Sequence, residues 1–148
     1  MITYTSSLAG ITSENLQGGF FVGWSHPPSP NVHYQILANS AAIALARNEA
    51  GMVVGFITAI SDGVSCAYIP HLEVLPDYQG LGIGTELVKR MLARLRHLYM
   101  IDLVCDPALQ PFYEQLDMRP VVGMVVRNYD RQSCEPIIPV EDTPTKEQ

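Results

Sequence analysis

Hydrophobic and polar positions along the chain divide it into short apolar runs, turn residues and one long amphipathic stretch. The runs Ala41–Ala46 and Met52–Ile60 are joined by a connection ending in Gly51, which predicts a β-hairpin. A second turn, Ser61–Gly63, leads into the apolar run Val64–Leu75. Together these runs predict a three-strand antiparallel meander.

Between Gly82 and Leu98, apolar residues recur every three or four positions, whereas the basic residues lie outside that stripe. This spacing predicts one helix that packs a single face on the sheet. Met100–Cys105 is then the next strand, and the helical crossover makes it parallel to Val64–Leu75. We therefore expect an α/β fold in which helices flank both faces of a mixed sheet.

Weaker patterns predict the remaining elements. Thr3–Ser7 is a candidate edge strand, and Ser29 followed by proline begins a helix that runs to about Leu37. Asp106 followed by proline caps a further helix to about Leu116, and Pro120–Asn128 is predicted to be the last strand.

Length and composition indicate one globular domain. The chain has 148 residues, of which 47% are hydrophobic and 16% charged. We assign residues 1–129 to this domain and residues 130–148 to an acidic, proline-rich tail. The tail is expected to be mobile or docked on a second subunit, for which the apolar stretch Ile137–Val140 is suited, so a homodimer is one possible assembly.

Net charge and hydropathy exclude two classes of partner. The formal net charge is −6, which argues against nucleic acid because phosphate neutralisation requires a basic face. No apolar run reaches the roughly 20 residues of a membrane span, and the first residues lack a basic region before an apolar one. We expect a cytoplasmic protein without a membrane partner. Three widely spaced cysteines, Cys66, Cys105 and Cys134, predict neither a disulfide framework nor a metal site.

A glycine-rich turn, Gln79–Gly84, opens directly onto the long helix. Three of its six residues are glycines, so their main-chain N–H groups are not covered by side chains. These N–H groups lie at the positive end of the helix dipole. Such a turn is an anion site, and a phosphate or pyrophosphate is the expected ligand.

Three phosphate-binding designs compete for this turn. A Walker loop requires lysine followed by Ser or Thr after the last glycine, whereas Gly84 is followed by Thr85 and Glu86. A dinucleotide fingerprint fits poorly, because the glycine spacing is wrong and an antiparallel meander precedes the turn. The third design, Gln/Arg-x-x-Gly-x-Gly/Ala, matches at every fixed position.

With that motif the chain resembles the N-acetyltransferases related to Gcn5, the GNAT superfamily. Leu72–Gly80 is similar to the strand that enters the family's loop, and Phe112–Pro120 resembles its second signature, Phe-Tyr-x-x-x-Gly-Phe. Asp117 stands where the family usually has glycine. The resemblance implies a sheet that splays between Val64–Leu75 and Met100–Cys105.

The resemblance also implies an acyl donor, acetyl-CoA, and residues that would bind it. The glycine turn would hold the pyrophosphate, and the backbone around Leu72–Val74 would pair with the pantetheine arm. Tyr113 matches the tyrosine that can protonate the leaving thiolate. The expected cofactor-binding residues are Leu72, Val74, Gln79, Gly80, Leu81, Gly82, Ile83, Gly84, Thr85 and Phe112.

Two polar residues precede the turn on one face of the predicted strand. His71 and Glu73 alternate with apolar Leu72 and Val74. A general base must titrate near working pH, which suits His71 directly and Glu73 if it is partly buried or acts through water. A third alternative is that the amine loses its proton to solvent and neither residue is the base.

The N-terminal part supplies aromatic candidates for an acceptor pocket. Phe21, Trp24, His26 and Tyr34 suit an amine with an apolar or aromatic body. The pattern of Val22–Trp24, Ala38–Ser40 and Asp77–Gly80 also resembles the plant and cyanobacterial branch that acetylates arylalkylamines such as serotonin.

With these residues, the resemblance implies direct acetyl transfer to a primary amine in a ternary complex, with no metal. The alternatives are acetylation of lysine or of an N-terminus in a protein or peptide, and a non-catalytic acyl-CoA-binding module.

Overall fold

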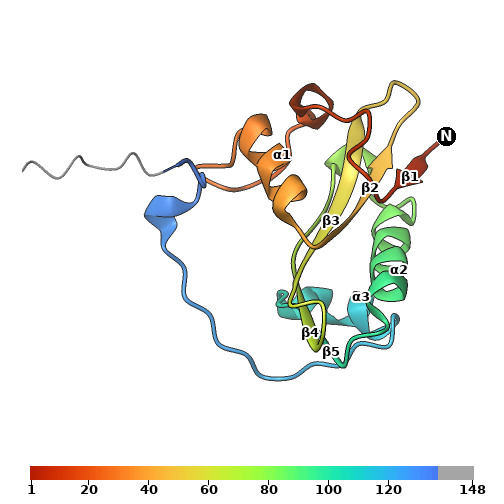
Figure 1. Cartoon of the computed structure of the whole chain (residues 1–148), viewed down its shortest axis with the longest axis vertical. Coiled ribbons are helices and arrows are strands. Elements are labelled where there is room, and N and C mark those ends of the chain that lie inside the picture. The colour runs from red at the N-terminus through yellow and green to blue at the C-terminus, as the bar shows by residue number, and fades with distance from the viewer. Residues whose placement is uncertain (137–148) are drawn as a thin grey trace, which may run out of the picture.

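The computed structural model describes residues 1–136, and its centre is a five-stranded sheet (Figure 1). The strands lie side by side in chain order. They are β1 (Thr3–Thr5), β2 (Ala42–Arg47), β3 (Val53–Ser61), β4 (Cys66–Val74) and β5 (Met100–Asp102). The predicted docking stretch at residues 137–140 and the rest of the tail after it lie outside the described residues.

The predicted meander is confirmed, because β1 to β4 pair antiparallel and β4 pairs parallel with β5. The carboxylate of Asp62 closes the tip of the β3–β4 hairpin by accepting the N–H groups of Val64, Ser65 and Cys66. These hydrogen bonds, together with one from the Ser65 hydroxyl, hold the pKa of Asp62 well below its usual range. The turn therefore lies where the sequence predicted it, directly after the end of β3 at Ser61.

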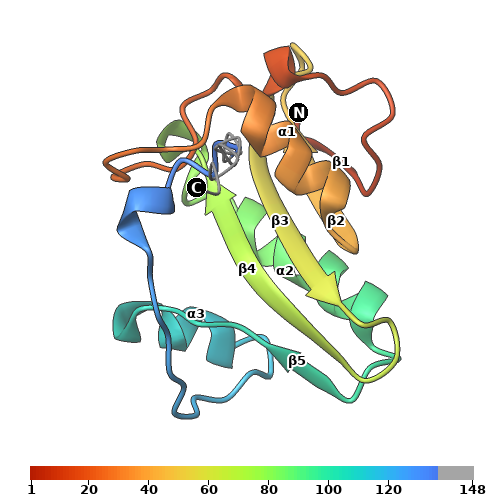
Figure 2. The ribbon, with the colours of Figure 1, turned by 60° about the vertical axis from the view of Figure 1, so that its left-hand side comes forward.

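Helices cover both faces of the sheet, as expected (Figure 2). On one face lies α1 (Pro30–Asn39), whose first turn is capped by the Ser29 side chain accepting from the Val32 N–H. On the other lies α2 (Ile83–Leu95), which contacts β2, β3 and β4. It packs closely at Gly55, where an added Cβ would lie 3.2 Å from side-chain atoms of Ile83 and Leu87.

The last third of the described chain is less regular than predicted. β5 ends at Asp102, and the following helix begins as a 3₁₀ turn, Pro107–Leu109, before α3 (Gln110–Glu114). Pro111 accounts for this interruption, because it lacks the N–H that a continuous helix would donate to the carbonyl of residue 107.

The predicted strand over residues 120–128 is wrong: within residues 1–136 this stretch belongs to no sheet. It runs along the outside of the domain and ends at a 3₁₀ turn, Tyr129–Arg131 (Figure 1). Its composition suits a strand, but composition alone does not supply the neighbouring backbone that a strand requires. In residues 1–136, no helix combines the length and apolar character needed to cross a bilayer.

Candidate active site

The glycine turn folds as two left-handed residues that lead into α2. Gly80 and Gly82 have φ values of +78° and +81°, and Gly82 is the N-cap of the helix. Within the described chain, the main-chain N–H groups of residues 80–85 donate to no protein acceptor. The nearest helix carboxylate, Glu86, is paired with Arg90 at 2.7 Å. The turn therefore presents a row of free donors at a helix N-terminus, which is a fit for a pyrophosphate.

Gly84 brings three elements of the site together. A Cβ built at this position would lie 3.7 Å from the Phe112 ring and 3.8 Å from the Val74 side chain. Three elements thus meet at Gly84: the end of β4, the start of α2, and helix α3. Leu81 is exposed and Ile83 is buried in the core, and the backbone N–H of each donates to no described acceptor, so it is free for a ligand.

β4 and β5 diverge beside this junction. Their pairing consists of Cys66 with Met100, Ala67 with Ile101 and Tyr68 with Asp102. From residue 69 to the end of β4 at Val74, no described strand pairs with β4 on the β5 side. The Leu72 backbone and the Val74 N–H therefore pair with no described strand on that side, as the predicted splay requires, whereas the Val74 carbonyl accepts Gln79 Nε2.

Tyr113 lies on α3 at the same end of the sheet. It is half-buried, and its ring packs edge-on against Phe112 with centroids 4.9 Å apart. Burial, with a smaller contribution from nearby Cys105, raises the pKa of Tyr113 to about 12. The phenol therefore keeps its proton at neutral pH and can act as a proton donor.

His71 and Glu73 share one face of β4, as alternation predicted, but their surroundings differ. The Glu73 carboxylate accepts the N–H of Phe21 at 2.6 Å and the N–H of Val22 at 3.0 Å. These bonds attach the aromatic loop to the sheet. Burial lowers the pKa of His71, whose ring centroid is 5.9 Å from that of Phe21, so its imidazole is neutral at neutral pH.

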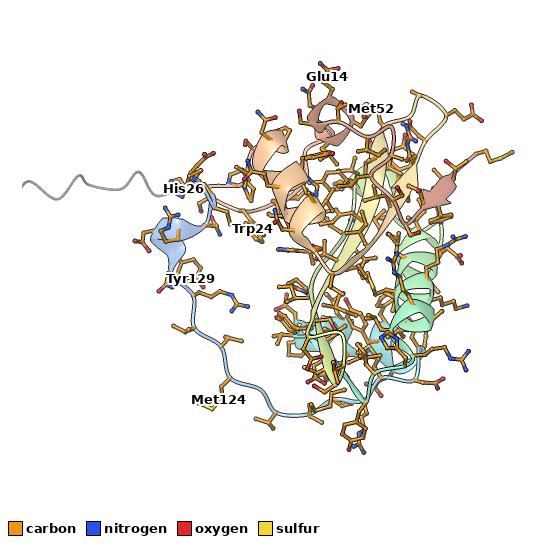
Figure 3. The ribbon with its side chains drawn as sticks, viewed as in Figure 1. Glu14, Trp24, His26, Met52, Met124 and Tyr129 are labelled. Atoms are coloured by element: carbon orange, nitrogen blue, oxygen red, sulfur yellow. The ribbon has the colours of Figure 1, made fainter. Side chains whose placement is uncertain are left out.

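The structure brings some of the predicted acceptor residues together. Phe21 is buried with a left-handed backbone (φ +62°), and the Trp24 ring lies 4.9 Å from it and 6.4 Å from the His71 ring. Trp24 and His26 line a hollow of about 590 Å³ together with Tyr129 (Figure 3). Tyr34, on α1, is half-buried against the core and does not line this hollow.

Two buried members of this aromatic cluster were not predicted from the sequence. Phe56 on β3 and His33 on α1 have ring centroids 4.3 Å apart, and His33 is 1% exposed. Burial lowers the pKa of His33 to about 4. Alternation along β3 could have placed Phe56 on the His71 face, but no local pattern marks His33 as buried.

Comparison with known proteins identifies the family. Residues 12–118 match the model of the Acetyltransferase (GNAT) family. A crystal structure of a protein assigned as an acetyltransferase from Deinococcus radiodurans R1 is 43% identical and has a TM-score of 0.88, with 92% of this chain and 94% of that one covered.

Two curated relatives match shorter regions. The uncharacterized N-acetyltransferase ycf52 of Pyropia yezoensis is 31% identical over 99 residues, which are 64% of this chain and 57% of that protein. The chloroplastic serotonin N-acetyltransferase 2 of Oryza sativa subsp. japonica is 37% identical over 73 residues, 48% of this chain and 36% of that protein. The chain thus spans only part of the length of these relatives. With the family model covering well over half of its residues, the chain belongs to the GNAT acetyltransferase family.

Proposed function

We propose that this protein is an acetyl-CoA-dependent N-acetyltransferase that acetylates a primary amine, specifically a small arylalkylamine, by direct attack in a ternary complex. The observation that carries the proposal is the junction at Gly84. It unites the donor-rich turn, the unpaired end of β4 and the helix that carries Tyr113.

The residues present fit acetyl-CoA, which when bound supplies the acetyl group as a thioester. The N–H groups of residues 80–85 would hold the pyrophosphate, and Gln79 fixes the entry to the turn by donating from Nε2 to the Val74 carbonyl. The Leu72 backbone and the Val74 N–H would hold the pantetheine arm, with Phe112 and Thr85 beside it.

Two side chains would move protons. His71 is neutral at neutral pH and can take a proton from the ammonium group of an incoming amine. Tyr113 holds its proton and can donate it from Oη to a leaving thiolate. Glu73 would act chiefly as the anchor of the aromatic loop, because both of its oxygens accept main-chain N–H groups. One catalytic base and one catalytic acid would thus lie on different elements.

The substrate class rests on the aromatic loop. Phe21 and Trp24 lie beside His71, and Trp24 and His26 line the neighbouring hollow. Aromatic walls suit an amine with a flat apolar body. The rice relative is named as a serotonin N-acetyltransferase, which supports the same class.

A screen of acceptors tests this proposal. Purified protein with acetyl-CoA is given tryptamine, serotonin, tyramine, polyamines and lysine or N-terminal peptides, and free thiol release is recorded. We expect arylalkylamines to give the highest kcat/KM, and Tyr113→Phe to lower kcat by about 100-fold with CoA affinity unchanged. Preference for peptides would contradict the substrate class. CoA binding without thiol release for any amine would contradict catalysis.

A further inference from the structure

Two polar side-chain atoms in the core have no hydrogen-bond partner among the described residues. They are Nε2 of His33 on α1 and Oγ1 of Thr58 on β3. His33 is 1% exposed and Thr58 is 0% exposed. A buried polar atom loses the hydrogen bonds that it makes to solvent in the unfolded chain, so native proteins pair nearly all such atoms, using an ordered water where no protein group is in reach. Each of these two atoms therefore requires a partner.

Both residues lie on the sheet face that carries His71, the face covered by α1 (Figure 2). Thr58 is the direct register partner of His71 in the antiparallel pair of β3 and β4, so their side chains project from the same face as neighbours. Phe56, two positions before Thr58, shares this face, and its ring centroid is 4.3 Å from that of His33 and 6.2 Å from that of His71. The Phe21 ring lies 5.0 Å from His33 and 5.9 Å from His71. The three polar residues thus occupy one small aromatic part of the core.

The His71 imidazole needs a partner of its own. It lies among aromatic rings and makes no hydrogen bond to the described residues. Glu73, the other polar residue on this face of β4, already accepts the main-chain N–H groups of Phe21 and Val22. A histidine base must keep one ring nitrogen unprotonated, and the hydrogen bond made by the other nitrogen decides which one that is. A polar group beside the ring is therefore required to fix the tautomer of His71.

One water molecule matches the needs of all three side chains. Water both donates and accepts, so it can bond to the Thr58 hydroxyl, to Nε2 of His33 in either tautomer, and to one nitrogen of His71. These make about three hydrogen bonds, the usual number for a buried water. His33 does not store the proton, because burial and the nearby His71 lower its pKa to about 4. Its part in such a group is to orient and not to relay.

We propose that Thr58 and His33 are positioning residues for His71: one buried water, shared by Thr58 Oγ1, His33 Nε2 and a nitrogen of His71, fixes the ring with its other nitrogen free for the acceptor amine. Thr58 and His33 touch no substrate, because both are buried, and act through His71. The inference rests on the proposed function for the task of His71. The hydrogen-bonded group itself is observable without acetyl-CoA or an amine.

Histidine NMR of the full chain without ligands is the first test. Long-range ¹H–¹⁵N spectra across a pH titration report the tautomer and pKa of each of the four histidines, and His71→Ala assigns the His71 signals. We expect one dominant His71 tautomer in the parent. Thr58→Val removes the hydroxyl at nearly constant volume, so it should mix the tautomers and lower the pKa of His71 by at least about 0.5, because the charged ring loses a polar partner.

Two matched variants serve as controls for Thr58→Val. Thr58→Ser keeps the hydroxyl and should retain the parent tautomer and pKa. Thr3→Val makes the same substitution at an exposed position of β1 and should leave the His71 signals unchanged. The other titratable groups near His71, Glu73 on β4 and His33 on α1, are the same in all of these variants, so they do not account for a difference. Circular dichroism checks that each variant is folded.

Kinetics with an amine found in the acceptor screen then connects the group to catalysis. Thr58→Val should lower kcat about 10-fold with the KM for the amine unchanged, and should move the acidic limb of the rate profile together with the pKa of His71. Thr58→Ser should stay within about 2-fold of the parent. A kcat that Thr58→Val leaves at the parent value would overturn the positioning role.

Two structural results would overturn the proposal without reference to activity. One is a His71 tautomer and pKa that are the same in the parent and in Thr58→Val. The other is a high-resolution crystal structure in which no water lies within hydrogen-bond distance of both Thr58 Oγ1 and His33 Nε2. If the spectra respond as expected but no amine is acetylated, the shared water is supported and the proposed function alone is contradicted.

Discussion

At the scale of single residues, the same face of β4 carries two polar side chains with different tasks. Glu73 and the amides it binds lie 51 and 52 positions apart in sequence, so its role as an anchor depends on tertiary contacts. The His71 imidazole makes no hydrogen bond to the described residues and lies beside the rings of Phe21 and Trp24. The two residues are therefore separable by mutation.

A pH–rate profile is the measurement that separates them. Burial lowers the pKa of His71, so the acidic limb of kcat/KM should have its midpoint below 6.5. His71→Ala should remove this limb and lower kcat/KM by about 100-fold. Glu73→Gln should keep the limb and mainly raise the KM for the amine, because the aromatic loop loses its anchor. An acidic limb that persists in His71→Ala would contradict the role of His71 as base.

At the scale of elements, β4, the glycine turn and α2 act as one unit. β4 ends where the turn begins, and the left-handed Gly82 directs the free N–H groups of the helix. The apolar spacing predicted this unit well, because the periodicities of a strand and of an amphipathic helix are local properties of the sequence. The helix is three residues shorter at its end than predicted, since the chain turns at Arg96–Leu98.

Two glycines of the turn should respond differently to alanine. Gly82→Ala forces a side chain into a left-handed conformation, which costs about 1–2 kcal/mol, and should lower both CoA affinity and the free energy of unfolding. The backbone of Gly84 is not left-handed, and an added Cβ would lie at van der Waals distance from Phe112 and Val74. Gly84→Ala should therefore change the free energy of unfolding by less than about 0.5 kcal/mol. Calorimetric CoA titration and urea unfolding measure the two effects. A Gly82→Ala variant equal to the parent in both would refute the assignment.

At the scale of the whole molecule, the two faces of the sheet are covered by different elements. The aromatic loop and α1 pack on the face of His71, while α2 packs on the face of Gly55. Sequence predicted the meander, the parallel β5 and helices on both faces. The sequence alone could not show that His33 is buried in the core or that residues 120–128 pair with no described strand. Both outcomes depend on contacts between segments that are distant in the sequence.

His33 makes global stability depend on pH. Its pKa is about 4 in the folded chain and about 6.5 when unfolded, so the unfolded state binds more protons between these values. The contribution of His33 to the free energy of unfolding is fully present above pH 6.5 and falls as the pH drops towards 4, by about 2 kcal/mol from pH 7 to 5. His33→Phe should lose less stability over this interval, in urea unfolding at both pH values. An equal loss in parent and variant would contradict the assignment.

The attachment of the aromatic loop through one glutamate has a consequence for redesign. The loop meets β4 through its main chain, so the identities of its side chains are independent of the bond that holds it. Residues 22–26, which follow the two buried phenylalanines, are thus an exchangeable segment: sequences from other family members could be transplanted there without altering the opposite side of the sheet. Acceptor preference would then change by grafting, provided that the glutamate and the left-handed kink at position 21 are retained.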